Sequence, residues 1–178
     1  LSKRLMRYKM IIGILGPSNL KSWKEMLDES FEFKLKEIIE SLKDKEIVIT
    51  PTNDSLPILV GSMYKSIGGV KLLGLIPMDD TEYGIDNIDE FFCDEIINSV
   101  TWRNNSCKFN EICDVLLVLG LSEGVLAEIG NAKWFNKPKV LIIEDFISQK
   151  LPIESTRNLN MKYISYDELD HHILERKE

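Results

Sequence analysis

Residues 114–143 limit the possible folds of this chain more than any other stretch, because they combine an apolar strand, a glycine-containing turn, a helix and a second apolar strand. The first part, DVLLVLG, has the length and the β-branched content of a buried parallel strand. Gly120 and Gly124 bracket the turn that follows. Since the first backbone amides of a helix have no acceptor within the helix, this layout predicts a site for a phosphate-sized anion at the helix N-terminus.

A glutamate near the start of the same helix is the first candidate for chemistry. Gly124 and Glu128 are four residues apart and share one helix face, and helical side chains lean back toward the N-terminus. The carboxyl group of Glu128 is therefore expected to reach over the turn that the anion occupies. The alternative is that Glu123 and Glu128 only stabilise the positive end of the helix dipole, by ~0.3–1 kcal/mol each.

The rest of the chain alternates apolar strands with amphipathic helices. Two consecutive strand–helix–strand units predict a parallel sheet, and the whole pattern predicts an α/β fold, a doubly wound domain. The long helix is expected to begin at Ser22 as its cap, with Glu25 completing a capping box, and residues 79–95 could form a loop, a short helix or both. Strands are expected at residues 10–15, 46–50, 70–76, 96–101, 115–119, 139–143 and 163–166, and helices at residues 22–42, 55–67, 105–113, from the turn at 120–124 to about 136, and from 167 onward.

In a doubly wound domain, ligands bind outside the C-terminal ends of the strands, near the point where the strand order reverses. The loop after the first strand and the loop after the Val115 strand both lie at such ends, and we expect them to face one another across one crevice. The predicted ligand-binding residues are Gly16, Pro17, Ser18, Asn19, Gly120, Leu121, Ser122, Glu123, Gly124 and Val125.

Length and charge set the broad class of the protein. A chain of 178 residues with 44% hydrophobic content is long enough for one well-buried domain, so residues 1–178 are expected to form a single unit with residues 1–9 as a flexible leader. The formal charge of −7 argues against a nucleic-acid partner or an anionic membrane surface, which need clustered Lys and Arg.

Cysteine usage and hydropathy point to the cytoplasm. Three cysteines without a CxxC or Cys/His pattern are expected to be reduced packing residues, and no apolar run is long enough to span a membrane. No metal site is predicted, because His171 and His172 are adjacent and project about 100° apart on a helix. We therefore expect a soluble cytoplasmic protein without a resident metal.

Three segments carry a resemblance to a known superfamily: IIGILGPSNL, GGVKLLGLIPMDD and DVLLVLGLSEGVLAEIGNAKWFNKPKVLI. Together they resemble the Rossmann-like superfamily of Lonely Guy proteins, formerly described as lysine decarboxylase-like, which includes molybdenum-cofactor carriers. Lonely Guy enzymes release the base from nucleoside 5′-monophosphates and carry a PGGxGTxxE motif in the third segment. The resemblance implies a catalytic role for Glu128, which matches the motif's glutamate, and for Arg103 as the upstream arginine, and it implies a homodimer or higher oligomer.

The departures from that motif bear on activity. Leu121 and Ser122 stand in place of paired glycines, and Val125 stands in place of the threonine. Losing the hydroxyl removes a donor, and losing glycines restricts the approach of the backbone to phosphate. The third segment is also similar to that of nucleoside deoxyribosyltransferases, in which the matching glutamate attacks the anomeric carbon of the sugar.

Two functions follow from these observations. The first is a carrier or sensor that binds a nucleotide or phosphorylated cofactor without turnover, which the altered glycine loops favour. The second is an N-glycosidic bond hydrolase or transferase in which Glu128 stabilises or captures the positive charge at the anomeric carbon and Arg103 clamps a 5′-phosphate. Both predict a small phosphorylated ligand at the same crevice.

Overall fold

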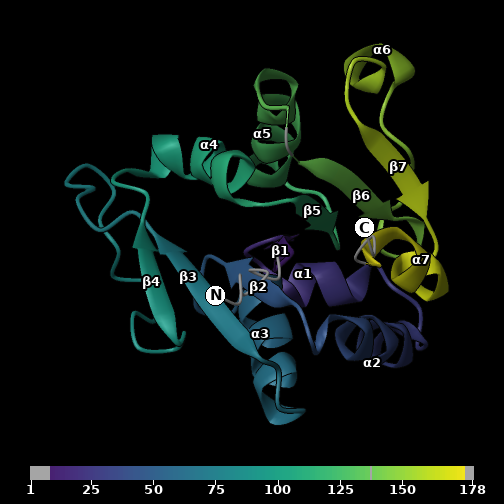
Figure 1. The fold of residues 1–178 in the computed structure, drawn as a ribbon, viewed down its shortest axis with the longest axis horizontal. Helices are drawn as coiled ribbons and strands as arrows, with labels where there is room; N and C mark the ends of the chain where they lie inside the picture. Colours follow the sequence, from purple (N-terminus) through teal and green to yellow (C-terminus); the bar gives the residue numbers. More distant parts are fainter. Residues whose placement is uncertain (1–8, 137, 175–178) are drawn as a thin grey trace, which may run out of the picture.

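A parallel sheet forms the centre of the computed structural model, which describes residues 9–136 and 138–174 (Figure 1). Across the described residues the strand order is β4-β3-β2-β1-β5-β6-β7, with every neighbouring pair parallel. The order reverses between β1 and β5, where Ile12 pairs with Val115 and Leu15 with Val118. The strands are β1 (Ile11–Leu15), β2 (Glu46–Ile49), β3 (Lys71–Ile76), β4 (Glu95–Asn98), β5 (Val115–Val118), β6 (Lys139–Ile143) and β7 (Met161–Ile164).

Helices cover both faces of the sheet, as Figure 1 shows. The α-helices are α1 (Leu20–Glu25), α2 (Phe31–Leu42), α3 (Leu56–Ser66), α4 (Trp102–Ile112), α5 (Glu123–Asn131), α6 (Ile153–Thr156) and α7 (Leu169–Ile173). Side chains of α1, α2, α3 and α7 pack in one core cluster, and side chains of α4 and α5 pack in the other. Alternate residues of one strand enter opposite clusters, Leu117 the first and Leu116 the second. Burial on both faces explains the continuous apolar runs of the sequence.

The predicted α/β class and the parallel, doubly wound sheet are confirmed. Each expected strand is present, although β4 ends at Asn98 rather than at residue 101. The chain turns there because Val100 has a φ of 73° and the Thr101 hydroxyl accepts a hydrogen bond from the Asn104 amide, which starts α4 three residues earlier than expected. Within residues 79–95 the structure has neither a helix nor a strand before Glu95.

The single helix expected at residues 22–42 is wrong, because the structure has α1 and α2 in its place. Asn19, not Ser22, caps α1 by accepting a hydrogen bond from the Ser22 amide at 3.0 Å. The break follows from Asp28, whose carboxylate accepts hydrogen bonds from both the amide and the hydroxyl of Ser30. Such local side-chain bonds compete with the helical pattern. The expected leader at residues 1–9 lies almost entirely outside the described residues.

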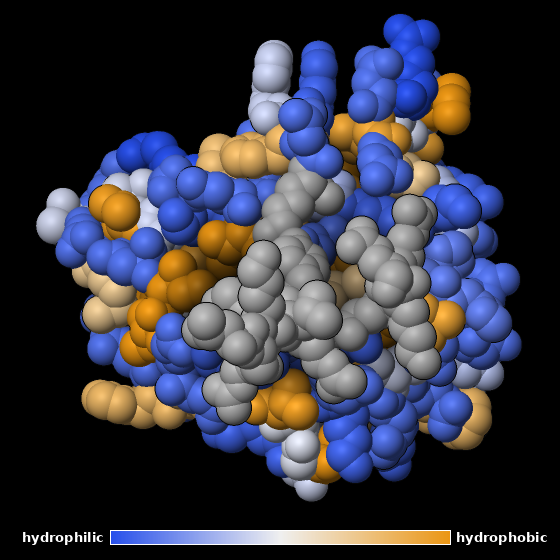
Figure 2. All heavy atoms as spheres, viewed as in Figure 1, coloured by the Kyte–Doolittle hydropathy of each residue, from blue (hydrophilic) through white to orange (hydrophobic). Residues whose placement is uncertain are grey.

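The surface is mostly hydrophilic on the face seen in Figure 2, where hydrophobic side chains gather beside β3 and β4. On β4, Ile96 is exposed, and the two ends of the strand, Glu95 and Asn98, are charged and polar. A short edge strand with such ends discourages pairing with another sheet edge. Among residues 9–136 and 138–174, no helix has the length and apolar character needed to cross a membrane.

Trp23 of α1 joins the two loops that follow β1 and β5. The indole is 1% exposed and packs against Phe31 and Phe146, and its Nε1 donates a hydrogen bond to the Leu119 carbonyl at 2.9 Å. A Cβ atom on Gly120 would lie 2.7 Å from the same Nε1. The close approach of indole and backbone therefore requires glycine at position 120 and fixes the end of β5.

We expect Trp23→Phe to destabilise the protein by at least ~1–3 kcal/mol, because the Leu119 carbonyl would remain buried without its donor. Urea unfolding followed by circular dichroism measures this free energy of unfolding. Trp134→Phe is the matched control, since Trp134 is 74% exposed and should change stability little. Equal stabilities of the two variants would contradict the role assigned to the indole hydrogen bond.

Candidate functional site

A cavity of about 400 Å³ lies at the C-terminal ends of β1, β2 and β5. Its position at the reversal of strand order is the one at which doubly wound domains bind ligands. The loops after β1, β2 and β5 and the N-terminal parts of α3, α4 and α5 form its walls. The polar and charged lining residues are Ser18 after β1, Thr50, Thr52 and Ser55 after β2, Arg103, Asn105 and Ser106 on α4, and Ser122, Glu123 and Glu128 at α5.

Backbone hydrogen bonds hold the loops around the cavity in place. The Leu56 amide donates to the Pro17 carbonyl, and the Leu20 amide donates to the Asp54 carbonyl, both at 3.0 Å. A Cβ atom on Gly16 would lie 2.6 Å from Leu56 Cδ2, so the loop after β1 packs directly on the start of α3. The loops after β1 and β2 therefore form one wall.

The N-terminus of α5 presents two unengaged backbone donors. Ser122 caps the helix, with its hydroxyl accepting from the Val125 amide at 3.3 Å and its carbonyl accepting from the Leu126 amide at 2.9 Å. Among the described residues, the amides of Glu123 and Gly124 donate no hydrogen bond. Both residues line the cavity, so the positive end of this nine-residue helix borders the cavity.

Gly124 leaves the first turn of α5 open. A Cβ atom there would meet only the Ser122 hydroxyl, at 4.0 Å, so packing does not require glycine at this position. Glycine inside a helix costs ~0.5–1 kcal/mol relative to alanine. Glycine at this position leaves the backbone of the cavity wall open to close approach from the cavity.

Glu128 lies one turn further along α5 and also lines the cavity. The residue is half-buried, and no hydrogen bond or ion pair reaches its carboxyl group from the part of the chain that the structure describes. Burial raises the pKa of Glu128 to about 8, because protein atoms replace the water that would stabilise the charge. At neutral pH the carboxyl group is therefore mostly protonated and can donate a hydrogen bond.

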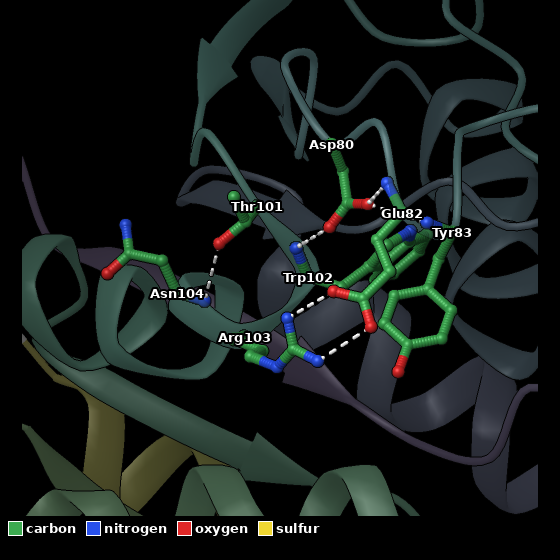
Figure 3. Close-up of polar contacts among 7 residues, drawn as sticks. All are labelled: Asp80, Glu82, Tyr83, Thr101, Trp102, Arg103 and Asn104. Carbon is green, nitrogen blue, oxygen red and sulfur yellow. Dashed lines mark hydrogen bonds and ion pairs between the residues drawn. The ribbon is translucent and has the colours of Figure 1, made fainter.

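Arg103 lies at the rim of the cavity rather than in its depth. Its side chain is 69% exposed, and both terminal nitrogens donate to the Glu82 carboxylate, Nη2 to Oε1 at 2.8 Å (Figure 3). The guanidinium also lies 5.6 Å from the centre of the Tyr83 ring. The pairing with Glu82 lowers the pKa of that carboxyl and raises the pKa of Arg103.

The structure brings most of the predicted site residues to one cavity. The lining includes Gly16, Ser18, Ser122, Glu123, Gly124, Val125, Glu128 and Arg103. Pro17, Asn19 and Leu121 instead border an adjoining hollow of about 600 Å³, which shares Ser18, Ser122 and Glu123 with the cavity. Gly120 lines neither of them and lies against Trp23.

Several residues that line the cavity were not predicted from the sequence. Asn105 is buried and donates to the Thr50 hydroxyl at 3.0 Å, while its carbonyl oxygen accepts from the Ser99 hydroxyl at 2.7 Å. Thr50 could have been predicted, because it follows a predicted strand at the same sheet edge as the two glycine loops. Asn105 carried no such signal, because the sequence pattern predicts the start of this helix only at residue 105, whereas α4 begins at Trp102. No cluster of three His, Cys, Asp or Glu side chains suited to a metal ion occurs within the described residues.

No protein-family model matches the chain, and no curated protein matches its sequence. Similar folds occur among solved structures. A molybdenum cofactor binding protein from the phototrophic bacterium Rippkaea orientalis is 17% identical with a TM-score of 0.68, over 94% of this chain and 96% of that one. The molybdenum cofactor carrier protein of Chlamydomonas reinhardtii is 16% identical with a TM-score of 0.63, over 93% and 96% of the two chains. The protein TM1055 is 18% identical with a TM-score of 0.67, over 92% and 98%. At these identities the similarity establishes a shared Rossmann-like fold.

The raised pKa of Glu128 predicts how the stability of the protein depends on pH. The folded chain holds this proton up to about pH 8, whereas the unfolded chain releases it near the usual value of 4.5. The free energy of unfolding should therefore fall as the pH rises between these values, by at most ~1.4 kcal/mol per pH unit. Glu128→Gln should remove this contribution. In thermal unfolding, the stability of the variant relative to the wild type should therefore rise from about pH 5 to pH 8. Glu123→Gln, an exposed residue on the same helix, is the control. Parallel curves for the wild type and Glu128→Gln would contradict the assignment.

Proposed function

We propose that this protein binds a nucleotide or a phosphorylated cofactor in the cavity at the C-terminal edge of its sheet and acts as a carrier or sensor. One observation carries the proposal. Within residues 9–136 and 138–174, the cavity wall combines two backbone amides without acceptors, those of Glu123 and Gly124, with a half-buried carboxyl group without a partner, that of Glu128. A ligand with an anionic group and a polar body would satisfy all three.

The anionic group belongs at the start of α5. Phosphate oxygens accept hydrogen bonds from amides at helix N-termini, and the helix dipole adds to the attraction. The Ser18 hydroxyl, on the facing loop, lines the same cavity and can donate as well. Binding through amides and hydroxyls suits a chain with a net charge of −7, because it needs few cationic side chains.

The protonation state of Glu128 favours binding over nucleophilic catalysis. A glutamate that attacks or stabilises an anomeric carbon acts as a carboxylate. With its pKa raised to about 8, Glu128 is instead mostly neutral at pH 7 and offers a ligand both a donor and an acceptor. This supports a role in recognising the polar body of the ligand.

The solved structures of similar fold support a cofactor as the ligand. Two of them are proteins that bind or carry the molybdenum cofactor. The cavity of this chain fits such a group in its volume of about 400 Å³, in its unengaged amides and in the space beside Gly124. Trp102 also lines it, is only partly buried, and can pack against a flat ring.

An N-glycosidic bond hydrolase or transferase is the second candidate. The raised pKa of Glu128 favours it in one respect, because a general acid must hold its proton at neutral pH to donate it to a departing base. Arg103 would then hold a 5′-phosphate. The two candidates differ in what Glu128 must do, which makes that residue the point of discrimination.

The anion site can be tested by removing one amide. Glu123→Pro deletes the N–H at the first helical position, where proline is well tolerated, and Ser122 before it already has the extended backbone that proline requires. We expect ribose 5-phosphate to bind ~10- to 100-fold more weakly by isothermal titration calorimetry, as for the loss of one hydrogen bond to a charged group. Glu123→Ala, which keeps the amide, is the matched control and should bind at least as tightly as the wild type. Equal weakening in both variants, or no binding of any phosphorylated compound by the wild type, would overturn the proposed site.

Glu128→Gln separates the two functions. Glutamine mimics the neutral acid, so a carrier should keep its affinity for nucleoside 5′-monophosphates within about threefold, with no free base released by either protein. An enzyme should release base in the wild type and lose at least ~100-fold of that rate in the variant. Chromatography of the incubated nucleotides measures the release, and base release that depends on Glu128 would replace the carrier function with the enzymatic one.

A further inference from the structure

The loop after β3 places a carboxylate on the guanidinium that faces the cavity. Glu82 accepts two hydrogen bonds from Arg103, in the parallel arrangement in which guanidinium also binds phosphate (Figure 3). Arg103 lines the cavity, whereas Glu82 does not. The carboxylate therefore occupies the anion-binding edge of Arg103, the one arginine that the described part of the chain contributes to the cavity wall.

We infer that Glu82 is a specificity-determining residue: it holds Arg103 in the free protein and yields it to the anionic group of the ligand, so that it sets the affinity of the site for phosphate esters. The inference rests on the proposed function and names a residue that regulates the same site. It does not require Glu82 to touch the ligand.

The strength of the pair suits such an exchange. The side chains of Arg103 and Glu82 are 69% and 53% exposed, and exposed ion pairs contribute little net free energy because water and salt screen them. A phosphate dianion carries more charge than a carboxylate and would gain the α5 amides at the same time. A carboxylate ligand lacks this advantage. Competition with Glu82 for Arg103 therefore favours phosphate dianions over carboxylates as ligands.

The backbone near Glu82 need not move for the exchange. Asp80 accepts hydrogen bonds from the amides of Glu82, Tyr83 and Trp102 at 3.0, 2.7 and 2.9 Å. These bonds, the one from Tyr83 above all, hold the pKa of Asp80 below its usual value, so its carboxylate stays charged and keeps the loop against the start of α4. Trp102 adds a hydrogen bond from its indole to the Gly84 carbonyl at 2.8 Å. Rotation of the Glu82 side chain alone is sufficient to free Arg103.

The test is a calorimetric titration of the full chain with ribose 5-phosphate. Glu82→Gln should tighten binding about two- to fivefold, because the ligand would no longer have to break an exposed ion pair to reach Arg103. Glu95→Gln is the matched control, because Glu95 is 58% exposed, pairs with Lys71 at the opposite end of the sheet edge, and changes the net charge equally. Its affinity should equal that of the wild type.

A second background separates competition for Arg103 from a general effect of negative charge. With Arg103→Gln already present, Glu82→Gln should no longer tighten binding, because no guanidinium remains to be released. Unchanged affinity in the Glu82→Gln single variant, or the same tightening in both backgrounds, would overturn the inference while leaving the proposed function intact. Absence of binding by the wild type and by Glu82→Gln alike would overturn both. Thermal unfolding confirms that each variant is folded.

Discussion

The hydrogen bond from the Trp23 indole to the Leu119 carbonyl is the contact on which the site depends. It ties α1, which follows the first loop, to the end of β5, and Gly120 makes the close approach possible. Because β1 and β5 are neighbours at the reversal of strand order, fixing their two loops also fixes the distance across the cavity. The rigid sheet supplies the position, and the loops supply the chemistry.

The chemistry of the cavity is that of a binding site with few charges. Backbone amides at α5 and hydroxyls from the facing loops can bind an anion, and burial keeps Glu128 mostly neutral. An ionised Glu128 close to the same anion would repel it, so the high pKa of this residue and the anion site are consistent with one another. The guanidinium of Arg103 is available only in exchange for Glu82. These features are the basis of the proposal that the protein retains a phosphorylated ligand rather than turning it over.

The sequence predicted the fold well because burial on both faces of a parallel sheet leaves unmistakable apolar runs, as in Val115–Val118. It failed at residues 22–42, where the local hydrogen bonds of Asp28 interrupt an amphipathic pattern that continues through the break. The loops at the strand ends were also predictable as part of a site. The contact between Glu82 and Arg103 was not, because 21 positions of loop and strand separate them and no periodicity connects the two. The burial that raises the pKa of Glu128 likewise depends on packing between α4 and α5.

The most direct test of the central claim is a nuclear magnetic resonance titration of the ¹⁵N-labelled protein with inorganic phosphate. If the anion binds at the N-terminus of α5, the amide signals of Glu123 and Gly124 should move downfield and saturate together, since these amides would gain an acceptor that the described residues do not supply. Shifts confined to exposed lysines such as Lys21 and Lys24, with both α5 amides unchanged at saturation, would contradict the account.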